Sequence, residues 1–167
     1  MANKFFTVAN AGTGGAPVTR AYVADAAATF IRGAAVLIDT DGEIIECSAD
    51  PTVILGFTAA ANLSAPGYDA ANSPTVITGR QNEVVVYLGE STNIFACRGV
   101  NGGTDPVTPA TTNIGESYGI LKDANGVWTL DLAETTVKSM TVVEIDVDQK
   151  IFYVKMVASR YQLALAN

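Results

Sequence analysis

The chain has 167 residues and contains no histidine. Histidine is the commonest general base in enzymes and a principal ligand of transition metals. Its absence excludes Ser-His-Asp and Cys-His nucleophiles and histidine-based metal centres. The two cysteines, Cys47 and Cys97, also lack the closely paired spacing of a zinc site. Both stand among apolar residues, so we expect small buried hydrophobes, and a disulfide between them stays open.

Charged residues are also scarce. They make up 16% of the chain, against about 25% in a typical soluble protein. The net charge is −7 and the ten basic residues are dispersed. Because phosphate binding needs clustered Lys and Arg, we expect no nucleic-acid partner. Two interpretations of the charge-poor surface stay open: a protein partner covers part of it, or it is a soluble surface of small neutral side chains.

Long apolar runs are missing as well. No segment approaches the roughly 18 consecutive apolar residues of a membrane span, so we expect no membrane partner. The first eight residues carry one lysine and too few apolar residues for a secretory signal. We therefore expect a protein that is made and folded in a reducing cytoplasm.

Short motifs that suggest metal or phosphate chemistry fail on their spacing. Asp39-Thr-Asp-Gly42 begins like a calcium-binding loop, but its glycine is at position four instead of six. Asp146-Val-Asp148 has Lys150 at the fifth position. Gly12-Thr-Gly-Gly15 lacks the following Lys-Ser/Thr of a phosphate-binding loop. We interpret the first motif as a turn and the last as part of an arm.

Two further patterns are weighed in the same way. Asn62-Leu-Ser64 is a glycosylation sequon, which matters only in a secreted eukaryotic protein. The pairs Glu43/Glu46 and Asp131/Glu134 have the residue types used in glycoside hydrolysis, but we interpret them as solvated strand faces or edges. The sequence therefore predicts no catalytic residue, no cofactor-binding residue, no metal site and no cofactor, and we expect no enzyme.

The segment 139–158 carries the clearest structural signal. Two apolar-rich strands flank Asp148-Gln149, and a turn centred there places odd positions opposite even ones. The acidic residues Glu144, Asp146 and Asp148 fall on the other face. This one-sided hairpin is typical of a β-structured packing or assembly protein. The expected facing pairs are Ile145 with Phe152, Val143 with Val154, and Thr141 with Met156.

Two more hairpins are predicted from turn residues. Asp41-Gly42 is a preferred two-residue type I′ turn within segment 34–47. The second hairpin spans 118–132 about the loop Asp123–Gly126. The first turn is expected to pair Ile38 with Ile45 and Val36 with Cys47. In the second, Trp128, Leu130 and Leu132 are expected on one face, with Thr129 and Asp131 on the other.

Further strands are predicted at 53–59, 75–78, 83–88 and 93–98, and no long amphipathic helix is found. Many short strands separated by turn residues indicate an all-β fold, a single-domain β-sandwich or β-barrel. Residues 20–33 fit helix or strand, and we favour a strand that enters the core at Phe30.

Three segments have little periodicity. Residues 1–20 are expected to form an extended N-terminal arm before a single β-domain over 21–167, because residues 9–19 carry few bulky side chains. The connections 60–74 and 99–114 are longer than loops usually are in compact domains. Neither carries the acids and bases of an active site, so a contact role is expected.

Several short runs stand out: Phe30-Ile-Arg-Gly-Ala-Ala-Val-Leu-Ile-Asp39, then Gly42–Cys47 and Ile54–Ala59, with further pieces at 115–119, 126–128 and 146–154. These runs resemble the cement or decoration proteins of tailed-bacteriophage heads. The likeness covers most of the chain from about residue 30. The resemblance implies a small β-domain on the outer capsid surface of the virion. It also implies a homotrimer that bridges subunits of the major capsid protein, with no catalytic residues.

We therefore expect a structural virion protein, made in the host bacterial cytoplasm. Two alternatives stay open: another phage structural subunit, such as a tail tube or tail fibre, and a non-catalytic carbohydrate-binding β-module.

Overall fold

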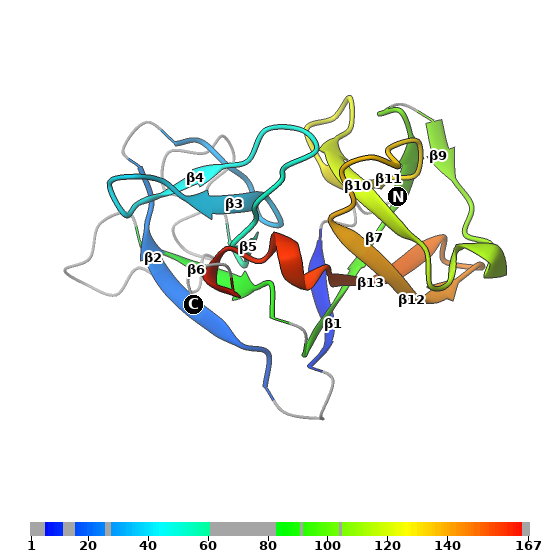
Figure 1. The fold of residues 1–167 in the computed structure, drawn as a ribbon, viewed down its shortest axis with the longest axis horizontal. Coiled ribbons are helices and arrows are strands. Elements are labelled where there is room, and N and C mark those ends of the chain that lie inside the picture. Colours follow the sequence, from blue (N-terminus) through cyan, green and yellow to red (C-terminus); the bar gives the residue numbers. More distant parts are fainter. Residues whose placement is uncertain are drawn as a thin grey trace.

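The computed structural model shows an all-β protein built from two sheets (Figure 1). The expected fold of sandwich or barrel type is therefore confirmed. The predicted strand 75–78, the motifs at 12–15 and 62–64, and nearly all of the connection 60–74 lie outside the described residues. The described residues are 6–11, 16–25, 28–60, 83–90, 92–103 and 105–164.

The smaller sheet lies at the left of Figure 1 and has the strand order β2-β6-β5-β3-β4. A bridge between Ala24 and Ile44 brings the end of the first strand in this order beside the last. The amide of Asp25 donates to the Ile44 carbonyl at 3.1 Å, so this sheet nearly closes into a barrel. Its strands are β2 (Thr19–Val23), β3 (Ala35–Ile38), β4 (Ile44–Glu46), β5 (Gly56–Thr58) and β6 (Glu83–Leu88).

The larger sheet has the order β1-β7-β13-β12-β10-β11-β8-β9. Its strands are β1 (Thr7–Ala11), β7 (Asn93–Cys97), β8 (Gly99–Asn101), β9 (Asp105–Val107), β10 (Ser117–Lys122), β11 (Trp128–Asp131), β12 (Met140–Asp146) and β13 (Ile151–Met156). Only Arg98 separates β7 from β8. Because β7 pairs with β13 and β8 pairs with β11, this continuous stretch closes the sheet into a second barrel. Three short 3-10 helices complete the described elements: η1 (Thr111–Asn113), η2 (Ala158–Arg160) and η3 (Gln162–Ala164).

One hydrophobic core contains side chains of both sheets. Phe6 stacks on Phe57 of β5 with ring centroids 4.1 Å apart, and Phe57 meets Phe95 of β7 edge-on at 4.9 Å. All three side chains are fully buried. This aromatic row fixes the two sheets against each other.

The same row changes the interpretation of the N-terminal segment. Buried Phe6 anchors the chain, strand β1 pairs with β7, and strand β2 pairs with β6. The described part of the expected arm therefore belongs to the sheets. Strand pairing and the Phe6 anchor hold the described residues of this segment in place. Phe30 is buried as expected, although the preceding strand ends at Val23.

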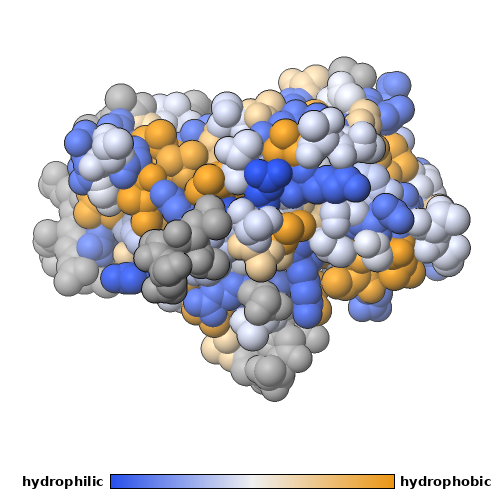
Figure 2. Space-filling view, viewed as in Figure 1, coloured by the Kyte–Doolittle hydropathy of each residue, from blue (hydrophilic) through white to orange (hydrophobic). Residues whose placement is uncertain are grey.

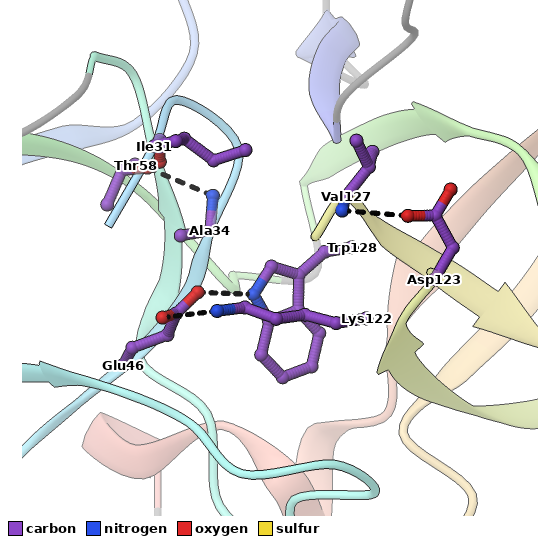
Figure 3. A network of polar contacts seen from close by, with 8 residues as sticks. All are labelled: Ile31, Ala34, Glu46, Thr58, Lys122, Asp123, Val127 and Trp128. Atoms are coloured by element: carbon purple, nitrogen blue, oxygen red, sulfur yellow. Dashed lines mark hydrogen bonds and ion pairs between the residues drawn. The ribbon is translucent and has the colours of Figure 1, made fainter. Parts of the chain in front are cut away.

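A polar contact also joins the sheets (Figure 3). Glu46, at the end of β4, accepts a hydrogen bond from Trp128 Nε1 at 2.8 Å and forms an ion pair with Lys122 Nζ at 2.6 Å. In the smaller sheet, the buried Thr58 hydroxyl donates to the Ile31 carbonyl and accepts from the Ala34 amide. Each buried polar group named here therefore has a partner.

Both predicted Gly-containing turns form, but with three-residue loops. Asp39 Oδ1 accepts from the amides of Asp41 and Glu43, at 2.9 and 3.1 Å. Asp123 Oδ1 does the same with the amides two and four residues later. Gly42 has φ +85°, the left-handed conformation that ends such a loop. The aspartate adds one residue to the turn, so the predicted partners of Val36 and of Ile38 are each wrong by one residue. The observed pairs are Val36 with Glu46, Leu37 with Ile45, and Ile38 with Ile44.

Strand β11 is buried on both faces, contrary to the expected alternation. It lies between β10 and β8. Thr129 and Asp131 are 3% and 5% exposed, while Leu132 is half-buried. The connection 99–114 also differs from an unstructured loop, because it contains β8, β9 and η1.

The hairpin of β12 and β13 contains a β-bulge. Ile145 opposes Phe152 as predicted, but Val142 opposes Val154 and Met140 opposes Met156. The predicted partners of Val143 and Thr141 are therefore wrong, because one extra residue lies in β12 between Val142 and Glu144. In a regular strand with Ile145 facing the core, Val143 would also face the core, and Val142 and Glu144 would face outward. Because of the bulge, Val142 faces the core instead.

Candidate interaction surface

The two cysteines are free and buried, as expected. Burial, together with the charge of the adjacent Glu46, raises the pKa of the Cys47 thiol to about 12. Burial also raises the pKa of the Cys97 thiol. Thiolates, not thiols, are the reactive species, so both side chains act as apolar packing groups.

Asp131 and Glu134, one of the carboxylate pairs compared with glycoside hydrolases, accept hydrogen bonds from backbone amides. Asp131 is buried, and its Oδ1 accepts from the amides of Gly102 and Ala133 at 3.1 and 3.0 Å, so its interpretation as a solvated residue is wrong. Glu134 accepts from the amides of Val137 and Thr136, and these bonds lower its pKa. Within the described part of the chain, no group of three His, Cys, Asp or Glu side chains is placed to hold a metal ion.

A cavity of about 150 Å³ lies between the β8–β9 hairpin and the turn that follows β10. Its lining includes the charged side chains of Arg98 and Asp123 and the hydroxyl group of Thr129. The Thr129 hydroxyl donates to the Leu121 carbonyl at 3.3 Å. Arg98 Nε is buried, with no hydrogen-bond partner in the part of the chain that the structure describes. This lining pairs no nucleophile with a base.

The more distinctive feature is an apolar patch beside β12. Four large hydrophobic side chains are exposed among the described residues, and three belong to one region: Ile114 at 48%, Val143 at 36% and Val147 at 49% exposure. The amide of Gly115 donates to the Val142 carbonyl at 2.8 Å, so the chain at Ile114 lies alongside β12. Figure 2 shows apolar surface at the lower right, where Figure 1 places β12 and β13. We call Ile114, Val143 and Val147 the apolar patch.

The bulge is responsible for part of this patch. Met140, Val142 and Ile145 face the core, and Val143 is the inserted residue on the outside. Bulges commonly redirect a side chain at a sheet edge. The sequence signal for this feature is the spacing of the inward apolar residues, which changes from two to three between Val142 and Ile145. Pairing by strict alternation had placed Val143 in the core.

The residues next to the apolar patch in the sequence are acidic, and we call Glu116, Glu144, Asp146 and Asp148 its rim. Glu116, Glu144 and Asp148 are exposed, and Asp146 is half-buried with Oδ1 accepting from the Gln149 amide at 2.8 Å. Lys150 is the cation of the same turn. The arrangement can bind an apolar protein surface, and its rim favours a partner with basic side chains.

Neither the scan against protein-family models nor the search of curated proteins found a match. In the described residues, no helix is both long enough and apolar enough to cross a membrane.

Proposed function

We propose that this chain is a non-catalytic structural virion protein, a decoration protein that binds the outer surface of an assembled phage head. In this role it would bridge subunits of the major capsid protein, as a homotrimer. The apolar patch beside β12 carries the proposal. The sequence resemblance to cement proteins of tailed phages supplies the class of partner.

Binding by such a surface has a simple energetic basis. Among the described residues, three of the four exposed large hydrophobic side chains belong to the apolar patch. Grouped exposed apolar surface marks contact sites more often than isolated residues do. A protein that binds the assembled lattice and not its free subunits stabilises the lattice by linkage. This role needs contact surface, and it needs no general acid or base.

Binding to heads is the direct test. Purified protein should co-sediment with heads that lack it, and those heads should withstand a higher temperature before releasing DNA. The double variant Ile114→Ser/Val143→Thr should bind roughly tenfold more weakly or worse, because two half-exposed apolar side chains lose their contact. Val23→Thr is the matched control, since Val23 is 42% exposed on β2, away from the apolar patch.

The outcomes separate the proposal from its competitors. Absence of co-sedimentation, together with equal thermal survival of heads with and without the protein, would reject the decoration role. Rings or polymers formed by the protein alone would favour a tail-tube subunit.

A further inference from the structure

Along residues 143–146, next to the apolar patch, one edge of β12 has no partner strand in the described part of the chain. On one side, β12 pairs with β13 along almost its whole length. On the other side, β10 pairs only with its first two residues, and Glu116 and Gly115 hydrogen-bond to Val142. Beyond Val142, the backbone of residues 143–146 forms no hydrogen bond on that side with the described chain.

Unpaired edges of this kind attract other strands, and proteins usually protect them with charge, proline or a bulge. The edge strand β9 carries Pro106. The β12 edge carries the bulge at Val143 and the acidic residues Glu144 and Asp146. It also has the exposed apolar side chain of Ile114 nearby. The edge is therefore protected against a chain of like charge but open to one of opposite charge.

We propose that residues 143–146 receive an extended segment of a partner protein, which adds as a strand to the free edge of β12. The segment carries Lys or Arg side chains, which face Glu144 and Asp146, and an apolar side chain on the same face, which contacts Val143 and Ile114. Backbone hydrogen bonds give such β-augmentation its affinity, and side-chain contacts give it specificity. This inference rests on the proposed function, because it names how the capsid subunit would engage the apolar patch.

A second copy of this chain fits the edge poorly. Two copies paired through this edge would bring Glu144 and Asp146 of one close to the same carboxylates of the other, and like charges across a strand pair are destabilising. A basic segment gains attraction from the same side chains, and the rim speeds its encounter at low salt. The acidic rim therefore favours a basic partner segment over self-association.

The first test uses synthetic peptides and the full chain. A seven-residue peptide alternating Lys and Val should shift the amide signals of residues 143–146 in NMR spectra and slow their hydrogen exchange. A Glu-Val peptide of the same pattern should not. A Lys-Val peptide N-methylated on alternate backbone amides keeps the charges but loses the N–H donors along one edge, and it should bind at least fivefold more weakly. Equal binding of the methylated and unmethylated peptides would overturn strand addition.

The second test changes the protein. Glu144→Gln/Asp146→Asn should weaken Lys-Val peptide binding about five- to tenfold, since cross-strand charge pairs contribute modestly. Asp41→Asn/Asp105→Asn removes two exposed carboxylates elsewhere and should leave binding unchanged. Equal effects of the two double variants would mean that general charge, and not the edge, attracts the peptide, and would overturn the proposal.

Assembled heads separate this inference from the proposed function. If the wild-type chain binds heads and Glu144→Gln/Asp146→Asn binds them equally well at every salt concentration, the edge proposal fails and the decoration role stands. If the wild-type chain does not bind heads but binds the Lys-Val peptide at residues 143–146, the decoration role fails and the edge proposal stands. Sedimentation showing dimers that strengthen in Glu144→Gln/Asp146→Asn would instead assign the edge to a second copy.

Discussion

Asp50 is a carboxylate in an unfavourable position. Its backbone has φ +50° and its amide donates to the Ile120 carbonyl at 2.9 Å. Its Oδ1 is buried and has no hydrogen-bond partner among the described residues. Burial raises its pKa, and the nearby charges of Glu134 and Asp131 raise it further. The neighbouring Gly119 leaves it room, because a Cβ there would lie 2.6 Å from Oδ1.

Asp50→Asn should therefore stabilise the protein at pH 7. Asparagine has the same shape and tolerates positive φ well, and it removes the charge. Because the folded pKa is raised, the folded state favours protonated Asp50, and the wild type gains stability as pH falls through that pKa. The advantage of the variant should be roughly 0.5–1 kcal/mol at pH 7 and should vanish below the ordinary aspartate pKa.

Urea unfolding between pH 3.5 and pH 7 measures this effect, with exposed Asp105→Asn as the control. A variant that is no more stable than the wild type at pH 7, or whose advantage is the same at every pH, would contradict the electrostatic explanation.

At the scale of the element, the bulge in β12 makes a specific prediction. Deleting Val143 should restore a regular ladder, because Met140, Val142 and Ile145 then keep their inward positions opposite β13. We expect the deletion variant to fold with a stability within about 1 kcal/mol of the wild type, since an exposed residue is lost. Denaturant unfolding and hydrogen exchange across the hairpin check this.

Deleting Tyr153 from β13 is the matched control. It would turn either Phe152 or Val154 away from the core, and both are fully buried, so a loss of at least 2 kcal/mol is expected. Similar losses in the two deletion variants would show that the bulge itself stabilises the hairpin, against the expectation.

Sequence patterns predicted most elements better than their registers. Short apolar-rich runs located 83–88 and 93–98 within a residue of β6 and β7. Register failed where a side chain altered the backbone: Asp39 lengthened its turn through two hydrogen bonds that composition does not reveal. The burial of Asp131 likewise depends on β8, a strand from a distant segment that pairs in parallel with β11.

At the scale of the whole molecule, the candidate surface is a joint product of distant segments. A role in contacts was predicted for 99–114 and stays a prediction, and Ile114 at its end is exposed. Its position beside Val143 depends on the pairing of residues 115–116 with Val142. No local pattern contains that information, because segments about thirty residues apart must first meet in the larger sheet.

The junction between the two sheets yields the last prediction. Trp128 is 1% exposed, and its indole N–H donates to Glu46 across the junction. Glu46→Ala removes the acceptor and leaves this buried donor without a partner, which costs about 1–3 kcal/mol. Glu46→Gln keeps an acceptor and loses only the ion pair with Lys122, whose side chain is 42% exposed. This variant should therefore lose at most about 1 kcal/mol of stability, and added salt should reduce its difference from the wild type.

Trp128 is the only tryptophan of the chain, so its fluorescence reports on the junction while far-UV circular dichroism reports on both sheets. The single core predicts one coincident transition by the two probes in the wild type. In Glu46→Ala both transitions should shift together to a lower urea concentration, whereas the transitions of Glu46→Gln should remain close to those of the wild type. Equal losses in the two variants would assign the stabilisation to the ion pair, and a fluorescence change that precedes the dichroism change would mean that the sheets separate before they unfold.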